Sequence, residues 1–416
     1  MIAAKLPEGW SNRRLRFDAR LNPVKSESRL HDDEEVSFVP MDAVGELGGL
    51  RLDEIRTVDD VYTGYTYFCD DDVVVAKITP CFENGKGAHA TGLHNGVAFG
   101  TTELHVIRAN PNLDARFLFY VTMADDFRSY GSAEMVGAGG QKRVPERFLK
   151  DWQTPLPAID IQRGIAAFLD EKLMQLDGLI TRKQALLERL AEKRQAIITG
   201  AVTKGLNPAA PMKDSGIEWF RDIPAHWQVK RLNSFCDCQS GKAHEPFIDP
   251  EGAFVCVNAR FISTNGEAAK RCTENLSPST PGDILMVMSD LPKGRALARS
   301  FLVDDRDAYA VNQRVCRIRP QRGDPRYFSY QLNRNPQLMR HDDGNEQTHL
   351  PNAAFKQLLL LEPPADEQEQ IVAHLGKTID HLDTLKLRVD SSVIRLLEYR
   401  SALITAAVTG QIEDLQ

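Results

Sequence analysis

Side chains that can hydrogen-bond to planar polar edges or to phosphates gather in a few glycine-containing stretches. These stretches are FENGKGAHA (82–90), GAGGQKRVPERF (137–148), QSGKAHEP (239–246), LPKGRALA (291–298) and GNEQTHLP (344–351). Arg or Lys suits guanine, Asn or Gln suits adenine, and glycine turns expose backbone N–H groups to phosphates. The candidate contact residues are Asn84, Lys86, His89, Gln141, Lys142, Arg143, Ser240, Lys242, Lys293, Arg295, Asn345, Gln347, Thr348 and His349.

For any one of these residues taken alone, a solvated turn is the favoured explanation. The loops as groups favour contact with nucleic acid, because they recur in the two halves of the chain. Gln141 and Pro145, for example, match Gln347 and Pro351 at a shift of 206 residues.

Motifs for catalysis or metal binding are weak by comparison. Cys236 and Cys238 have no second Cys or His pair at the spacing of a zinc site. GKAHE (241–245) lacks the preceding glycine and following Ser or Thr of a phosphate loop. The sequence also shows no glycine-rich cofactor fingerprint and no amino-methyltransferase motif. We therefore expect a non-catalytic chain without a metal site.

The elements that must position the loops are written twice. EKRQAIITGAVTKG (192–205) and EYRSALITAAVTGQ (398–411) are nearly the same, and the match extends upstream at the same shift of 206 residues. DDVVVAKITPCFENGKGA (71–88) likewise resembles GDILMVMSDLPKGRALA (282–298), an apolar strand followed by a turn with Gly and Lys. The period is too long for a solenoid and indicates a duplicated half-protein.

Each half ends in a long amphipathic stretch. Apolar residues recur at spacings of three, four and seven, a pattern that favours a narrow seam packed on another helix. In the first half they are Ile161, Ile165, Leu169, Leu173, Leu176, Ile180, Leu187, Leu190, Ile197 and Ala201. In the second half they are Ile371, Leu375, Ile379, Leu382, Leu385, Val389, Val393, Leu396, Leu403 and Ala407.

The predicted fold class is α+β: two similar mixed α/β domains joined by two long helices that form an antiparallel coiled coil, with pseudo-twofold symmetry. The predicted boundaries are 1–154 for the first domain, 155–204 for the first helix, 205–218 for a connector, 219–362 for the second domain and 363–416 for the second helix with a tail.

Bulk composition sets few further limits. The chain has 416 residues and a formal net charge of −7, which by itself argues mildly against a nucleic-acid partner. Seven scattered cysteines favour a reducing cytoplasm over a disulfide framework. No apolar run approaches the length of a membrane helix, so we expect no membrane partner.

The order of these parts strongly resembles the specificity subunit of type I restriction–modification enzymes. The motifs that carry the resemblance are PLPAIDIQ (155–162), PPADEQEQI (363–371), RQAIITGAVTKGLNP (194–208) and SGIEWFRDIPAHWQVKRL (215–232), and it covers essentially the whole chain. One departure is AIDIQRGI at the start of the first helix, where a Glu-Gln pair is usual. We interpret these positions as polar residues of a helix N-terminus.

The resemblance implies that each domain is a target recognition domain reading one half of a bipartite sequence in double-stranded DNA. It implies that the coiled coil sets the spacer and docks two methyltransferase subunits, which restriction/translocase subunits then join. S-adenosylmethionine, Mg and ATP are expected in those partners, with no cofactor in this chain. Two other functions stay open: a coiled-coil assembly scaffold without direct DNA readout, and an enzyme in its own right.

Arg194 and Arg400 recur near the ends of the two long helices, each beside a glutamate two residues earlier. Residues two apart on a helix do not face each other, so these charges do not pair with those glutamates. They are either surface charges or contacts to a docked subunit. We favour the docked subunit, because both halves keep them.

Overall fold

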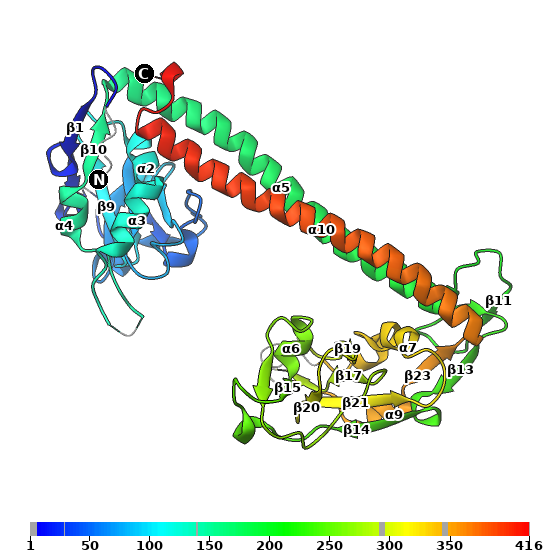
Figure 1. Cartoon of the computed structure of the whole chain (residues 1–416). Helices are drawn as coiled ribbons and strands as arrows, with labels where there is room; N and C mark the ends of the chain where they lie inside the picture. The colour runs from blue at the N-terminus through cyan, green and yellow to red at the C-terminus, as the bar shows by residue number, and fades with distance from the viewer. Residues whose placement is uncertain (1–5, 29, 139, 291–295, 343–347, 416) are drawn as a thin grey trace. The chain divides into compact units, whose positions relative to one another are not determined.

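The two halves of the sequence fold into two units in a computed structural model that describes residues 6–28, 30–138, 140–290, 296–342 and 348–415 (Figure 1). The first unit comprises residues 1–185 and 389–416, and the second comprises residues 186–388. Each long helix therefore has one end in each unit.

Among its described residues, the first unit pairs its strands in the orders β1-β10, β2-β9-β6-β7 and β4-β3-β8-β5. The strands are β1 (Ser11–Arg14), β2 (Ala19–Leu21), β3 (Glu35–Val39), β4 (Ile55–Thr57), β5 (Thr66–Cys69), β6 (Asp72–Ala76), β7 (Gly87–His89), β8 (Val97–Gly100), β9 (Leu104–Ala109) and β10 (Gln153–Leu156).

The second unit repeats most of this topology in the orders β13-β23, β14-β21-β17-β19 and β16-β15-β20, with the extra pairs β11-β12 and β18-β22. The strands are β11 (Met212–Asp214), β12 (Asp222–Pro224), β13 (Gln228–Arg231), β14 (Cys236–Ser240), β15 (Phe254–Val257), β16 (Lys270–Cys272), β17 (Ile284–Val287), β18 (Ser289–Asp290), β19 (Ser300–Leu302), β20 (Tyr309–Val311), β21 (Val315–Pro320), β22 (Thr348–His349) and β23 (Leu359–Glu362).

Short helices cover these sheets, and one long helix closes each half of the chain. The helices are α1 (Val58–Tyr62), α2 (Ala115–Met123), α3 (Asp125–Ala133), α4 (Glu146–Asp151), α5 (Ile159–Lys204), α6 (Ala259–Ser263), α7 (Pro325–Leu332), α8 (Pro336–Met339), α9 (Asn352–Gln357) and α10 (Ala365–Val408). None of the helices in the described part of the chain is both long and apolar enough to span a bilayer.

The central strands are buried runs of aliphatic residues. β6 (DVVVA) and β17 (ILMV) are fully buried, and each pairs with a strand on both sides. Such runs favour an interior strand because branched side chains pack well on a pleated surface. β9 and β21 pair antiparallel with them, in the same register in the two units. The duplication seen in the sequence is therefore a duplication of sheet topology.

The seams of α5 and α10 join the cores of the units. The start of α5 and the end of α10 pack in the first core through Ile165, Leu169, Ile404 and Val408. The end of α5 and the start of α10 pack in the second core. In each unit the two helices lie side by side and run antiparallel, as the sequence predicts (Figure 1).

Two polar residues at the starts of the long helices are buried. Gln162 and Gln368 are 0% and 2% exposed, and each accepts a hydrogen bond of 2.8 Å from the backbone N–H of an aspartate, Asp114 or Asp324. Each also donates to a proline carbonyl five residues earlier. They are polar residues of a helix N-terminus, as interpreted from the sequence, and they attach the long helix to the domain.

Candidate nucleic-acid interface

Two of the candidate loops in the first unit lie against each other at one end of β6. Arg143 forms an antiparallel bridge to Ile78 on one side and to Val136 on the other. The N–H of Thr79 donates to the carbonyl of Lys142 at 3.0 Å. The glycine-containing turn after β6 is therefore held beside the glycine run that precedes Gln141. We call this arrangement the first loop cluster (residues 77–86, 136–138 and 140–144).

A carboxylate from the turn before β9 holds Arg143 in place. The Nε and Nη2 atoms of Arg143 donate to Glu103 at 2.9 and 2.7 Å, and the two side chains are 43% and 24% exposed. The hydrogen bonds from Arg143 hold the pKa of Glu103 below its ordinary value. Lys142 and Gln141 are exposed beside it. These three candidate residues are therefore presented together.

The other candidates of the first unit make contacts within their own domain. Asn84 is exposed and donates to Glu46 at 3.2 Å. Lys86 is half-buried and its ammonium donates to the carbonyl of Met41 at 2.8 Å. The His89 side chain, 12% exposed, lies 3.2 Å from an Asp71 oxygen. A ligand of Lys86 or His89 must compete with these contacts.

The second unit builds the same arrangement. β18 and β22 pair antiparallel with Ser289 opposite His349 and Asp290 opposite Thr348. This matches the Ile78–Arg143 bridge of the first unit, so His349 corresponds to Arg143. His349 is exposed, whereas Thr348 is 1% exposed. We call residues 288–290 and 348–350 the second loop cluster.

Four candidates of the second unit lie outside the described residues. They are Lys293, Arg295, Asn345 and Gln347.

The third candidate loop of the second unit reaches this cluster from β14. The Oγ of Ser240 lies 3.9 Å from the sulfur of Met288, next to β18. Lys242 is exposed and its N–H donates to Val311. His244 is buried: its Nδ1–H donates to the Lys242 carbonyl at 2.7 Å, and its Nε2 accepts from Leu276. His244 therefore shapes the loop, and Lys242 and Ser240 are the exposed side chains.

Sequence reasoning missed the two charged positions beside these clusters. The carbonyl of Glu103 accepts from Lys77, and the carbonyl of Arg314 accepts from Met288 in the equivalent place. Glu103 therefore corresponds to Arg314, which is exposed. Aligning TELHVIRAN (102–110) with QRVCRIRPQ (313–321) pairs Glu103 with Arg314. This alignment is the sequence signal that could have identified the two positions.

An ion pair repeated in both units is structural by contrast. Arg108 donates twice to Asp72 at 2.6 Å, and Arg319 donates twice to Asp283 at 2.6 and 2.7 Å. Both aspartates are almost fully buried. Removing either arginine leaves a buried carboxylate without compensation, so these pairs tie β6 to β9 and β17 to β21.

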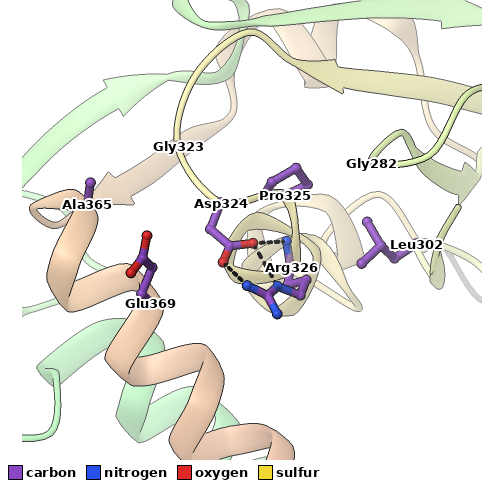
Figure 2. A pocket seen from close by; sticks show the side chains of 8 residues that line it. All are labelled: Gly282, Leu302, Gly323, Asp324, Pro325, Arg326, Ala365 and Glu369. Carbon is purple, nitrogen blue, oxygen red and sulfur yellow. Dashed lines mark hydrogen bonds and ion pairs between the residues drawn. The ribbon is translucent and has the colours of Figure 1, made fainter. Parts of the chain in front are cut away.

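A hollow of about 600 Å³ opens in the second unit where α7 begins beside α10 (Figure 2). Figure 2 shows the Arg326 guanidinium bound to Asp324, with Nε and Nη2 distances of 3.1 and 2.8 Å, and Glu369 contributed by α10. The residues that line it include no histidine, cysteine or serine. None of the candidate contact residues lines this hollow.

Arg194 and Arg400 contact acids on the opposite long helix. The Nε of Arg400 lies 3.0 Å from Asp177, and that of Arg194 lies 3.6 Å from Asp383. Asp177 and Asp383 are themselves equivalent at the shift of 206 residues. The same contact is thus made twice, once in each unit, and docking of a partner at these arginines stays a prediction.

Comparison with known proteins gives a family match in the second domain. Residues 224–389 match the model of the type I restriction modification DNA specificity domain. Over 207 residues the chain is 36% identical to the type I restriction enzyme EcoAI specificity subunit of Escherichia coli, covering 49% of this chain and 34% of that one. The second domain of this chain is therefore similar to the DNA specificity domain of type I specificity subunits.

More distant members of the family align along nearly the whole chain. The MjaVIII specificity subunit of Methanocaldococcus jannaschii is 22% identical over 99% of this chain and 95% of its own. A solved chain from a study of assembly and conformational transition of the type I R-M system has a TM-score of 0.76 at 17% identity. It covers 98% of this chain and 100% of its own, which confirms the predicted fold class.

The EcoAI alignment spans about a third of the length of that family member. The family match includes the second loop cluster, β14 to β22 and the start of α10. The contact residues predicted in the loops stay predictions.

Proposed function

We propose that this chain is the DNA-recognition subunit of a type I restriction–modification complex in the cytoplasm. Each unit reads one half of a bipartite target in double-stranded DNA. One observation carries the proposal: the same loop cluster is built twice, on the same end of the same sheet, in a chain whose residues 224–389 match a DNA specificity domain. Proteins with two reading modules place them on two half-sites.

The long helices would set the spacer between the half-sites and dock two methyltransferase subunits, with restriction/translocase subunits joining the complex. Support comes from the antiparallel contacts that α5 and α10 make in both units. The chain would contribute no catalysis of its own. S-adenosylmethionine, Mg and ATP would belong to the partner subunits.

The decisive experiment is a methylome. The chain is co-expressed with the methyltransferase subunit encoded beside it, and modified adenines in the host DNA are mapped. We expect one split motif with two short half-sites and a fixed gap. An assembled complex that methylates nothing would contradict the proposal and favour the scaffold function.

Salt dependence provides a second test. Binding of the co-expressed complex to a duplex carrying the motif should weaken as salt rises, by about 0.9 in log affinity per unit of log salt for each phosphate contact. Lys142→Ala and Lys242→Ala should each make this slope shallower. A slope that neither variant changes would show that the two loops do not contact phosphates.

A further inference from the structure

The loop clusters repeat in backbone and differ in side chains, and one of these differences is a pair of facing positions in and beside each cluster. Arg143 and Glu103 occupy it in the first unit, His349 and Arg314 in the second. The buried pairs Arg108–Asp72 and Arg319–Asp283, which support the sheet, are by contrast the same in both units. Residues that distinguish two different half-sites must differ between the units, whereas residues that hold the common fold need not. The pair Arg143–Glu103 differs between the units, as residues that distinguish two half-sites must.

The geometry of the pair leaves one face of the guanidinium unused by Glu103. Glu103 accepts one hydrogen from Nε and one from Nη2 of Arg143. The hydrogens on Nη1 and the second hydrogen on Nη2 point away from that carboxylate, because the guanidinium is planar. Those two groups form the fork that binds O6 and N7 of guanine in the major groove.

The backbone that carries Arg143 is fixed from three directions. Its own N–H and carbonyl pair with Val136 at 2.9 and 3.0 Å. The flanking residues are held too, because Thr79 donates to the Lys142 carbonyl and the buried His105 donates to the Val144 carbonyl at 2.8 Å. A side chain mounted in this way and oriented by a carboxylate loses little freedom on binding, which is what precise readout requires.

We propose that Arg143 reads a guanine in the half-site of the first unit and that Glu103 is the positioning residue that aims its guanidinium. The proposal rests on the function proposed above and adds the base and the residue that selects it. Among the residues that the structure describes, the exposed His349 and Arg314 form no carboxylate-bound arginine at the equivalent place, so the second unit reads its half-site differently.

Three variants in the co-expressed complex test the proposal by methylome. In the wild-type motif, one half-site should contain a guanine that Arg143→Gln makes degenerate. Losing a bidentate contact should reduce discrimination at that position about fivefold to 150-fold. Arg143→Lys keeps the charge and loses the planar fork, so it should also relax that guanine.

The third variant is Glu103→Gln. It keeps Arg143, but the glutamine side chain has only one oxygen that can accept a hydrogen bond from the guanidinium. It should relax the same position by a smaller factor, with the other positions unchanged. A merely structural role for Glu103 would lower the yield of complex without changing base preference. Arg322→Lys is the matched control: Arg322 binds Glu362 through Nε and Nη2 and is 52% exposed, but lies outside both loop clusters. It should leave the motif intact.

The outcomes separate this inference from the proposed function. A split wild-type motif that stays unchanged in all Arg143 variants overturns the guanine reading and leaves DNA recognition standing. Uniformly weaker methylation in Arg143→Gln, rescued by Arg143→Lys with every motif position intact, assigns Arg143 to a phosphate and also overturns the reading. No wild-type motif overturns the proposed function itself.

Discussion

One tryptophan is hydrogen-bonded in the second unit and its counterpart is not. The indole N–H of Trp227 donates to Glu367 at 3.0 Å, and Nε2 of His226 lies 2.7 Å from the same carboxylate. Trp10 is the equivalent residue, and its indole nitrogen is buried without a partner among the described residues. The position of Glu367 is occupied in the first half by Ile161, the departure already visible in the sequence.

Glu367→Ala should therefore give Trp227 the environment of Trp10. Leaving a buried donor unsatisfied costs about 1–3 kcal/mol. We expect faster hydrogen exchange in β13 and in the start of α10, measured by mass spectrometry. Glu369→Ala, at an exposed position two residues along the same helix, is the control. Equal exchange in the two variants would contradict a role for the carboxylate.

His105 makes the first unit sensitive to acid. Burial lowers the pKa of this imidazole, which donates to Val144 in its neutral form. Below its ordinary pKa of about 6.5 the unfolded chain takes up a proton that the folded site resists, so stability falls with falling pH. The loss has a limit of about 1.4 kcal/mol per pH unit between the unfolded and folded pKa values.

Urea midpoints at about pH 8 and about pH 5.5 should therefore differ less in His105→Gln, which keeps an N–H donor without titrating in this range. His381→Gln changes an exposed histidine of the second unit and should behave as wild type. A pH dependence that both variants share with wild type would assign the effect to other groups.

At the scale of elements, the two long helices are held by equivalent contacts of unequal burial. Arg400 is 6% exposed, and it also donates to the carbonyl of Leu47 at 3.0 Å. The Arg194 and Asp383 side chains are 41% and 52% exposed, at a longer distance. Exposed ion pairs contribute little, whereas a buried cation that loses its acid is costly.

Asp177→Asn and Asp383→Asn form a matched pair of variants. We expect the first to destabilise its unit by about 1–3 kcal/mol and the second by about 0–1 kcal/mol. Hydrogen exchange of the end of α10 and of the end of α5 reports the two effects separately. Equal losses would mean that the burial of Arg400 does not decide the cost.

At the scale of the whole molecule, equal lengths of α5 and α10 separate the helix contact of the first unit from that of the second. Seventeen residues along α5, from Asp177 to Arg194, correspond to seventeen residues back along α10, from Arg400 to Asp383. By this count, residues 182–188 of α5 are the counterpart in number of residues 389–395 of α10. Both segments are helical throughout, and removing both together keeps the register on either side.

This paired deletion removes one heptad, about 10 Å of helix. If the coiled coil sets the spacer, the gap in the methylated motif should shorten by about three base pairs, at roughly 3.4 Å each. Both half-sites should stay unchanged, as read by the same methylome experiment. Deleting 182–188 alone breaks the register and should abolish methylation. An altered half-site with an unaltered gap would contradict the spacer function.

The sequence by itself determined the architecture of this protein. The shift of 206 residues, the buried runs of β6 and β17 and the apolar seams of α5 and α10 are local patterns. These patterns show which residues are buried, because the period of a helix or strand determines which side chains share one face of it. The two strand-and-helix domains and the antiparallel helices were predictable for that reason.

Only the tertiary structure decided which polar groups meet. Arg143 and Glu103 are forty residues apart, and their contact depends on how β9 and the 136–144 loop are placed beside β6. The same holds for Gln368, a polar residue of a helix start that is buried against the loop before α7. Hydrogen bonds are short and directional, so the register between distant segments decides them, and no period in the sequence encodes that register.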